Sequence, residues 1–258
     1  MSLDILLAVH YLLVFGAAAI AGVINAVAGG GTLISFPTLI WLGIPSIEAN
    51  ATNTVALWPG SLGSVWGYRR EMRGLDTRVW ALVLPSVIGG LAGAILLYRT
   101  PADVFDRLVP VLILFATCLF MAQEPLQRRF NLVPYHEARS HWFSWVMFFQ
   151  LLVGLYGGYF GAGIGILMLA ALSVMGHTDI HQMNGIKNVL AVAINAVASM
   201  YFIVSGLVVW SDALVMAAGA VIGGVAGAGV ARRMGRAAVR RVVVIIGFAM
   251  AVSLMLRL

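Results

Sequence analysis

The sequence predicts an all-α polytopic membrane protein with about ten membrane segments. Composition is the first reason: 61% of the 258 residues are hydrophobic and only 10% are charged, whereas soluble domains carry about 25% charged residues. Nearly continuous apolar runs also recur from one end of the chain to the other, as helices in lipid require. A weak internal repeat, in which glycines and polar residues recur in the same order, is the third reason.

The apolar runs define ten candidate membrane segments. The first lacks the basic start of a signal peptide, so we interpret it as a retained helix. In chain order the segments are 4–28, 31–43, 48–68, 78–98, 103–122, 142–160, 163–175, 181–205, 211–231 and 238–257.

Two of these segments, 31–43 and 163–175, are shorter than the roughly 20 apolar residues that a span needs. Each directly follows a glycine cluster, Gly29-Gly30-Gly31 in the first half and Gly161-Ala162-Gly163 in the second. Short, glycine-interrupted segments at matching places in two halves are typical of transporter binding sites. The sequence therefore predicts broken or short helices around both clusters.

The two halves share little identity but show the same order of features, which predicts a first membrane repeat at 1–122, a linker at 123–141 and a second repeat at 142–258. The broken helices then fall at 22–43 and 154–175. At a shift of 132 residues the matched pairs are Gly22 with Gly154, Gly29 with Gly161, and Gly31 with Gly163; at a shift of 134 they are Asn50 with Asn184, Asn53 with Lys187, and Ser61 with Asn195.

Arginine clusters predict that the two five-segment repeats are inverted. The loops 69–78 and 232–241 hold four and five arginines, whereas their counterparts 206–210 and 99–107 hold none and two. Because Lys and Arg concentrate in cytoplasmic loops, equivalent loops with opposite charge lie on opposite faces. We expect loops 69–78, 123–141 and 232–241 in the cytoplasm and both termini outside. The same clusters explain the net charge of +6 without nucleic-acid binding.

Lys187, the only lysine, is the first candidate for chemistry. An unpaired charge at membrane depth costs roughly 3 kcal/mol or more, so this cation needs an anion. A lysine that snorkels to the interface or binds the carbonyls of a helix end is the alternative. Because Asn53, within another polar cluster, is its counterpart in the first half, we favour a shared central site.

The glycine clusters are the second candidate. A helix that starts inside the membrane has free N–H groups and about +0.5 of a charge at its N-terminus, which favours an anion. The amides around Gly29–Thr32 and Gly161–Gly163 would then form two facing cradles. Close helix packing without a ligand is the alternative. Taken together, the predicted substrate-binding residues are Asn25, Gly29, Gly30, Gly31, Thr32, Asn50, Asn53, Thr54, Gly161, Ala162, Gly163, Asn184, Lys187, Asn188 and Asn195.

The remaining polar residues suggest no enzyme. Asn25 and Asn195 need hydrogen-bond partners, either a neighbouring helix or a substrate. Asp179 and Glu48 are proton-coupling candidates, although helix capping or interfacial solvation is the commoner role of such acids. No metal site, cofactor site or catalytic triad is expected, since Cys118 is the only cysteine and a loop pair is favoured over metal ligation for the histidines at 177 and 181.

The paired motifs resemble the sulfite exporter TauE/SafE family. They are the run from Gly22 to Gly31 with the following Pro37, the run Asn50-Ala51-Thr52-Asn53, and the second copy from Gly154 to Gly163 with Asn184-Gly185-Ile186-Lys187-Asn188. The resemblance implies a transporter of small anions, such as sulfite, an organosulfonate or a related oxyanion, in the bacterial inner membrane. Ala162 departs from it, because the first copy has Gly30 there.

The sequence thus leads to a secondary transporter whose two halves alternate around a central anion site. A passive anion channel and a non-transporting membrane scaffold or assembly protein are the alternative functions. The expected partners are the small anion, the lipid bilayer and a co-transported proton or sodium ion, with a homodimer left open.

Overall fold

A computed structural model describes residues 3–27, 30–67, 69, 77–130, 140–175, 180–234 and 236–256. Every regular element in these ranges is an α-helix, as the apolar composition predicts. In chain order the helices are α1 (Leu3–Val27), α2 (Thr32–Trp41), α3 (Ser46–Gly67), α4 (Thr77–Ala81), α5 (Val83–Arg99), α6 (Ala102–Phe130), α7 (Ser140–Tyr159), α8 (Ile164–Val174), α9 (Ile180–Val204), α10 (Trp210–Met234) and α11 (Arg236–Met255).

The two short segments are short helices, as predicted. Helix α2 has 10 residues and α8 has 11, and each begins next to its glycine cluster. Proline and glycine stop or redirect a helix because they remove a hydrogen bond or add conformational freedom. Gly29 lies outside the described residues, so only Gly30 and Gly31 of the first cluster can be placed.

Two boundaries differ from the prediction. The segment 78–98 is split at Leu82 into α4 and α5, because Pro85 cannot donate to the carbonyl of Ala81 and its ring crowds that carbonyl. Helix α6 continues to Phe130, beyond the predicted apolar end at 122. Its added turns contain Glu, Leu, Gln and Arg, which favour helix without being apolar.

The helix surfaces are those of a multi-pass membrane protein. Among the described residues, four helices are long and apolar enough to cross a membrane: Asp4–Asn25, Val79–Arg99, Ala102–Ala122 and Gln182–Val204. Five shorter apolar helices accompany them. Large apolar side chains lie exposed around the bundle, including Trp66, Leu84, Trp145, Val204 and Ile245. Lipid, unlike water, tolerates such a surface.

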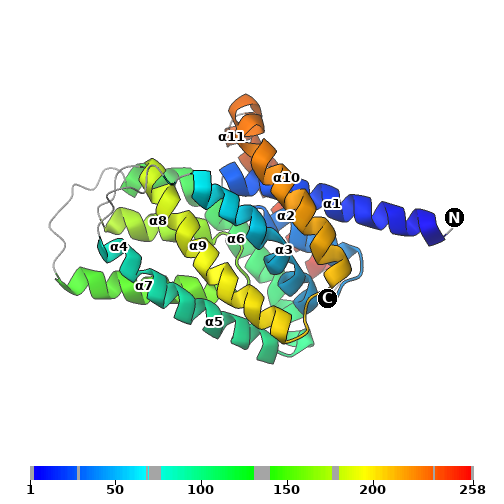
Figure 1. Ribbon diagram of the computed structural model, residues 1–258, viewed down its shortest axis with the longest axis horizontal. Coiled ribbons are helices and arrows are strands. Elements are labelled where there is room, and N and C mark those ends of the chain that lie inside the picture. The colour runs from blue at the N-terminus through cyan, green and yellow to red at the C-terminus, as the bar shows by residue number, and fades with distance from the viewer. Residues whose placement is uncertain are drawn as a thin grey trace.

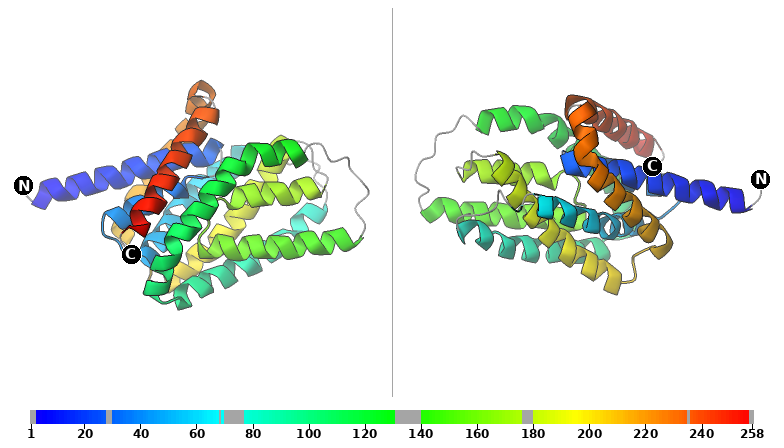
Figure 2. Two further views of the ribbon diagram at one scale, coloured as in Figure 1. Left: turned by 180° about the vertical axis from the view of Figure 1, so that it is seen from behind. Right: turned by 45° about the horizontal axis from the view of Figure 1, so that its top comes forward.

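The same packing recurs in both halves. Helix α1 packs along α10, and α7 packs along α5. Helices α5 and α7 lie side by side along the lower edge of the molecule in Figure 1, while the N-terminal half of α1 projects to the right. Helix α3 contacts α10, and α9 contacts α5. Helices α3 and α9 also pack on each other, as do α6 and α11, which are seen together from behind (Figure 2).

Glycines let the backbones touch at both of these helix pairs. A Cβ on Gly219 or Gly223 of α10 would overlap the carbonyls of Phe15 and Ala19 of α1. A Cβ on Gly93 of α5 would overlap the carbonyl of Leu155 of α7. Small residues allow this approach where lipid supplies no hydrophobic driving force.

Five fully buried phenylalanines belong to one hydrophobic core cluster. Phe36 and Phe160 meet edge to face, with centroids 5.3 Å apart, and Phe36 comes from the short helix α2 while Phe160 directly precedes the break before α8. Such a pair is worth about 0.5–1.5 kcal/mol beyond its buried area. The two helix breaks are therefore held against each other by the core. The five phenylalanines are Phe36, Phe105, Phe120, Phe160 and Phe202.

We expect Gly93→Ala to lower the free energy of unfolding by about 1–3 kcal/mol, because the added methyl must push α5 away from α7. Thermal unfolding in detergent measures the change. Gly16→Ala is the matched control, since its Cβ would meet nothing within 4 Å. Equal stabilities of the two variants would contradict backbone contact at Gly93.

Candidate functional site

The two helix breaks are built differently. Gly163, which precedes α8, has φ +79°, and Gly161 has the same value. Only glycine adopts this left-handed conformation without strain. Gly31, which precedes α2, has ordinary helical angles. The turn into α8 thus depends on glycine conformation, whereas the turn into α2 depends on a side chain.

That side chain is Asn25, near the end of α1. Its Oδ1 accepts a hydrogen bond from the Gly31 N–H at 2.8 Å, so it satisfies one of the amides that the start of a helix leaves free. The amide of Gly31 is therefore occupied within the protein. Gly30 has a packing role, because a Cβ there would press into the Phe120 ring at 2.6 Å.

A cavity of about 80 Å³ lies where α1, α2, α3, α8 and α9 meet. Eight of the residues predicted from sequence line it, and they come from positions as far apart as 25 and 195 in the chain. Its lining residues are Asn25, Thr32, Asn53, Thr54, Leu57, Ser61, Phe160, Gly161, Ile164, Gly165, Lys187, Asn188, Ala191 and Asn195.

The cavity is built from equivalent positions on α3 and α9. Every lining residue of α3 has its counterpart, 134 positions later, among the lining residues of α9. The helical spacing places these positions on one face of each helix. The pairs are Asn53 with Lys187, Thr54 with Asn188, Leu57 with Ala191, and Ser61 with Asn195.

Lys187 is the cation of this cavity. It is only 8% exposed, and its aliphatic stem crosses α8 at Gly165, where an added Cβ would lie 3.1 Å from Lys187 Cδ. Within the described parts of the chain, no hydrogen bond or ion pair of the Lys187 ammonium is found. None of the lining residues is acidic. Among the described residues, the positive charge of this cavity therefore has no protein counter-charge.

Asn53 presents a hydrogen-bond donor beside this charge. The Ser35 hydroxyl donates to Asn53 Oδ1 at 2.5 Å, and both residues are buried. With its oxygen engaged, the amide has its NH2 group left for the cavity. Thr54 differs, because its hydroxyl donates to the Asn50 carbonyl of its own helix at 2.9 Å.

The start of α8 adds backbone donors. Ile164 and Gly165 are the first two residues of this helix and both line the cavity. Amides in the first turn of a helix have no carbonyl of that helix to bind, and the helix dipole makes this end positive. Together with Thr32, Asn188 and Asn195, which also line the cavity, they form surroundings suited to oxygen atoms that carry negative charge.

Other predicted residues lie outside the cavity lining. Asn50 Nδ2 donates to the Tyr159 carbonyl at 2.9 Å, which ties α3 to the end of α7. The Ala162 carbonyl accepts a hydrogen bond from the Tyr156 hydroxyl at 2.8 Å. Gly30, Gly31, Gly163 and Asn184 are likewise not among the lining residues.

Of the two acidic candidates, only Glu48 can be placed, and it does not line this cavity. Glu48 lines a separate cavity of about 310 Å³ together with Ser46 and Asp106, whose side chains are hydrogen-bonded to each other. Asp179 and Gly29 lie outside the described residues.

Six lining residues were not predicted as binding residues: Leu57, Ser61, Phe160, Ile164, Gly165 and Ala191. All of them except Ser61 are apolar or glycine, so residue type gave no signal. The helical period did contain a signal for Leu57, because the helix face that carries Asn53 and Ser61 also carries Leu57. Ser61 itself had been matched to Asn195 but was not chosen as a ligand.

A polar, cation-bearing cavity at two helix breaks inside an apolar bundle defines a membrane transporter. The comparisons with known proteins agree: the chain belongs to the sulfite exporter TauE/SafE family, whose model matches residues 14–254.

Relatives in three bacteria carry transporter names. A "probable membrane transporter protein" of Haemophilus influenzae is 28% identical over 236 residues, which is 90% of this chain and 89% of the relative. The "probable membrane transporter protein ORF9" of a Sinorhizobium species is 28% identical over 250 residues (96% and 94%). The "probable membrane transporter protein YfcA" of Escherichia coli K12 is 26% identical over 247 residues (93% and 88%). No solved structure matches the chain.

We expect Gly165→Ala to weaken binding of small oxyanions about three- to tenfold while the protein remains folded. The new methyl group displaces the Lys187 stem by a few tenths of an ångström, and a flexible stem can yield at small cost. Titration of the thermal stabilisation with sulfite measures the effect. Gly63→Ala is the control, because its Cβ would meet nothing within 4 Å; the same affinity in both variants would contradict this contact.

Proposed function

We propose that this transporter is a secondary carrier of a small sulfur-containing oxyanion, bound in the central cavity. The observation that carries the proposal is the Lys187 ammonium, buried in a cavity that no carboxylate lines. An unpaired charge in such surroundings is costly, and an anion from outside removes the cost. The protein is thereby built to bind its substrate more tightly than water or a neutral solute.

Polyatomic oxyanions suit the donors better than a bare halide does. Asn53, Asn188 and Asn195 can supply side-chain NH2 groups, Thr32 a hydroxyl, and the start of α8 backbone amides. These donors come from several directions, which matches several oxygens spread around one central atom. Hydrogen bonds of this charge-assisted kind are roughly twice as strong as neutral ones.

Cavity size narrows the substrate class further. A buried water needs about 10–15 Å³ of such volume, so a cavity of about 80 Å³ has room for roughly five waters. Sulfite, with one sulfur and three oxygens, fits that space. Longer organosulfonates such as sulfoacetate need the cavity to widen. Sulfite-sized anions are therefore the preferred substrates.

Alternating access is supported by the exchange symmetry of the packing. If the first half is replaced by the second, the pair α1 with α10 becomes α7 with α5, and α3 with α10 becomes α9 with α5, which are the pairs that pack. The cavity is lined by equivalent residues of α3 and α9. Both facts favour two inverted repeats whose relative rocking exposes the cavity to one side at a time.

The proposed orientation follows from charge. The arginine-rich loops 69–78, 123–141 and 232–241 face the cytoplasm under the positive-inside rule. Both termini are then outside, and the membrane is the bacterial inner membrane.

We predict that Lys187→Gln weakens sulfite binding and exchange about 10- to 100-fold, because it removes hydrogen bonds to a charged group worth about 1.5–3 kcal/mol. Purified protein is tested by sulfite-induced thermal stabilisation and, in proteoliposomes, by exchange of radiolabelled sulfite. Arg107→Gln, at an exposed position of α6, controls for the loss of one positive charge. Wild-type binding and exchange in Lys187→Gln would overturn the proposal.

Moving the cation across the cavity is a sharper test. In the double variant Asn53→Lys, Lys187→Asn the charge sits at the equivalent position on α3. We therefore expect the double variant to bind sulfite at least tenfold more tightly than Lys187→Asn alone. The same titration measures this recovery. If a folded double variant recovers no affinity, the charge is needed at position 187 itself, and the two equivalent positions of the cavity are not interchangeable.

Transport assays separate the carrier from the alternative functions. A carrier accelerates labelled-anion uptake when unlabelled anion is present on the other side, whereas a channel does not. A membrane scaffold shows neither anion-dependent stabilisation nor flux for sulfite, thiosulfate, sulfoacetate, taurine or sulfate.

A further inference from the structure

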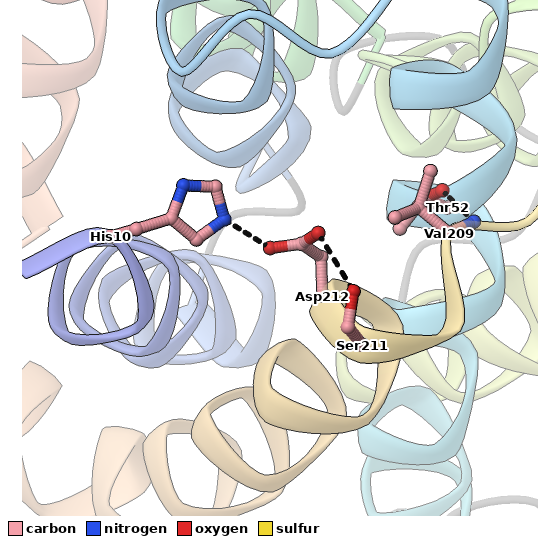
Figure 3. A network of polar contacts seen from close by, with 5 residues as sticks. All are labelled: His10, Thr52, Val209, Ser211 and Asp212. Carbon is pink, nitrogen blue, oxygen red and sulfur yellow. Dashed lines mark hydrogen bonds and ion pairs between the residues drawn. The ribbon is translucent and has the colours of Figure 1, made fainter. Parts of the chain in front are cut away.

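A second polar cluster, partly buried, lies away from the central cavity, where α1 meets the start of α10. His10 Nε2 and Asp212 Oδ1 are 2.6 Å apart, and the Ser211 hydroxyl donates to Asp212 Oδ2 at 3.3 Å (Figure 3). Asp212 is 4% exposed, while the His10 side chain keeps 25% of its exposure. One partner is thus buried and the other can exchange protons with its surroundings.

The interface around this pair depends on close contact. Below the pair, Gly219 and Gly223 of α10 pack directly on the α1 backbone at Phe15 and Ala19. Asp212 stands in the first turn of α10, where the helix dipole favours its negative charge. The ion pair therefore joins the two helices at a point where any change in charge alters how they attract each other.

Two connections run from this pair to the central cavity. Helix α1 carries His10 near one end and Asn25, a lining residue, near the other, about 22 Å away at the helical rise per residue. The Val209 N–H, just before α10, donates to Thr52 Oγ1 at 3.0 Å (Figure 3). Thr52 is fully buried and directly precedes Asn53 of the cavity.

Few other ionisable groups act on the pair. Helices α2, α3 and α10 pack against α1, and α1, α3 and α11 pack against α10. On these helices the remaining ionisable residues with described side chains are Asp4, Tyr11, Glu48 and Arg241. Tyr11 touches the His10 ring edge to face, 5.3 Å between centroids. Within the described part of the chain, His10 with Asp212 is the only ion pair found.

We propose that His10 and Asp212 form a proton-binding site that couples proton movement to anion transport. This inference rests on the proposed function and adds its driving ion. A partly buried polar pair at the helix interface, connected to the cavity through α1 and α3, has the placement that a coupling site needs. Of the two acidic residues suggested by the sequence, Glu48 lines another cavity and Asp179 lies outside the described residues.

The proton moves without net change to the protein. In the proton-free pair the neutral imidazole donates its Nε2–H to the carboxylate of Asp212. A proton from the aqueous phase on one side binds the other ring nitrogen of His10, Nδ1, so the hydrogen bond becomes charge-assisted. The α1 contact with α10 then strengthens, and the same proton leaves His10 Nδ1 to the other side after the cavity has changed its access.

The test uses the full-length protein in proteoliposomes at zero membrane potential, with radiolabelled sulfite and methanesulfonate, the charge of which does not change with pH. Two quantities are measured for each protein: anion exchange without a gradient, and accumulation driven by a pH gradient of one unit. One proton per monoanion gives about tenfold accumulation in the wild type. We expect Asp212→Asn and His10→Gln to keep exchange within about threefold and to lose the accumulation.

The controls separate the possible failures. Asp103→Asn changes an exposed carboxylate of α6 and should behave as wild type, and Glu48→Gln tests the competing candidate. Asp212→Asn keeps the shape and a hydrogen bond to His10; should it not fold, His10→Gln changes the more exposed partner.

Three outcomes overturn the inference: wild-type exchange without pH-driven accumulation, accumulation retained in both variants, or loss of exchange in a folded Asp212→Asn protein. If the wild type exchanges neither anion, the proposed function itself fails.

Discussion

The organisation of this structure depends on one unpaired cation inside an apolar bundle. The Lys187 ammonium is buried where α9 meets α8, and no anion pairs with it in the part of the chain that the structure describes. The described lining around it contributes donors but no carboxylate. Such an arrangement is stable only if the missing charge arrives from outside or if the group gives up its proton. Three features determine the surroundings of that charge: the two helix breaks, the amides at the start of α8 and the buried phenylalanines of the core.

The two halves resemble each other in packing and differ in chemistry. At equivalent positions of the cavity, Lys187 carries a charge where Asn53 carries an amide. The break before α8 depends on two left-handed glycines, whereas the break before α2 depends on the hydrogen bond between Asn25 and the Gly31 amide. Two-fold architecture thus supplies a shared frame, and divergence within it supplies one cation instead of two repelling ones.

Much of this organisation could be predicted from sequence because its causes are local. Apolar runs fixed the helices to within a few residues, and the glycine clusters located the short helices α2 and α8. Asn53 and Lys187, which match at a shift of 134 residues, line the same cavity in the structure. The sequence could not show which neighbour each residue contacts. The Asn50 amide donates to the Tyr159 carbonyl, and Gly30 packs against the Phe120 ring. The pair His10 with Asp212, separated by 202 residues, had no local signal at all.

Because Lys187 is the only lysine, its chemical labelling can measure how accessible the cavity is. Since the chain has no second ε-amino group, an amine-selective acylating reagent has one side chain to modify, and that side chain faces the cavity. The rate of labelling therefore reads how often the cavity opens to solvent and from which side of the membrane. Protection by a candidate anion would read occupancy directly, without introducing a cysteine or a fluorophore.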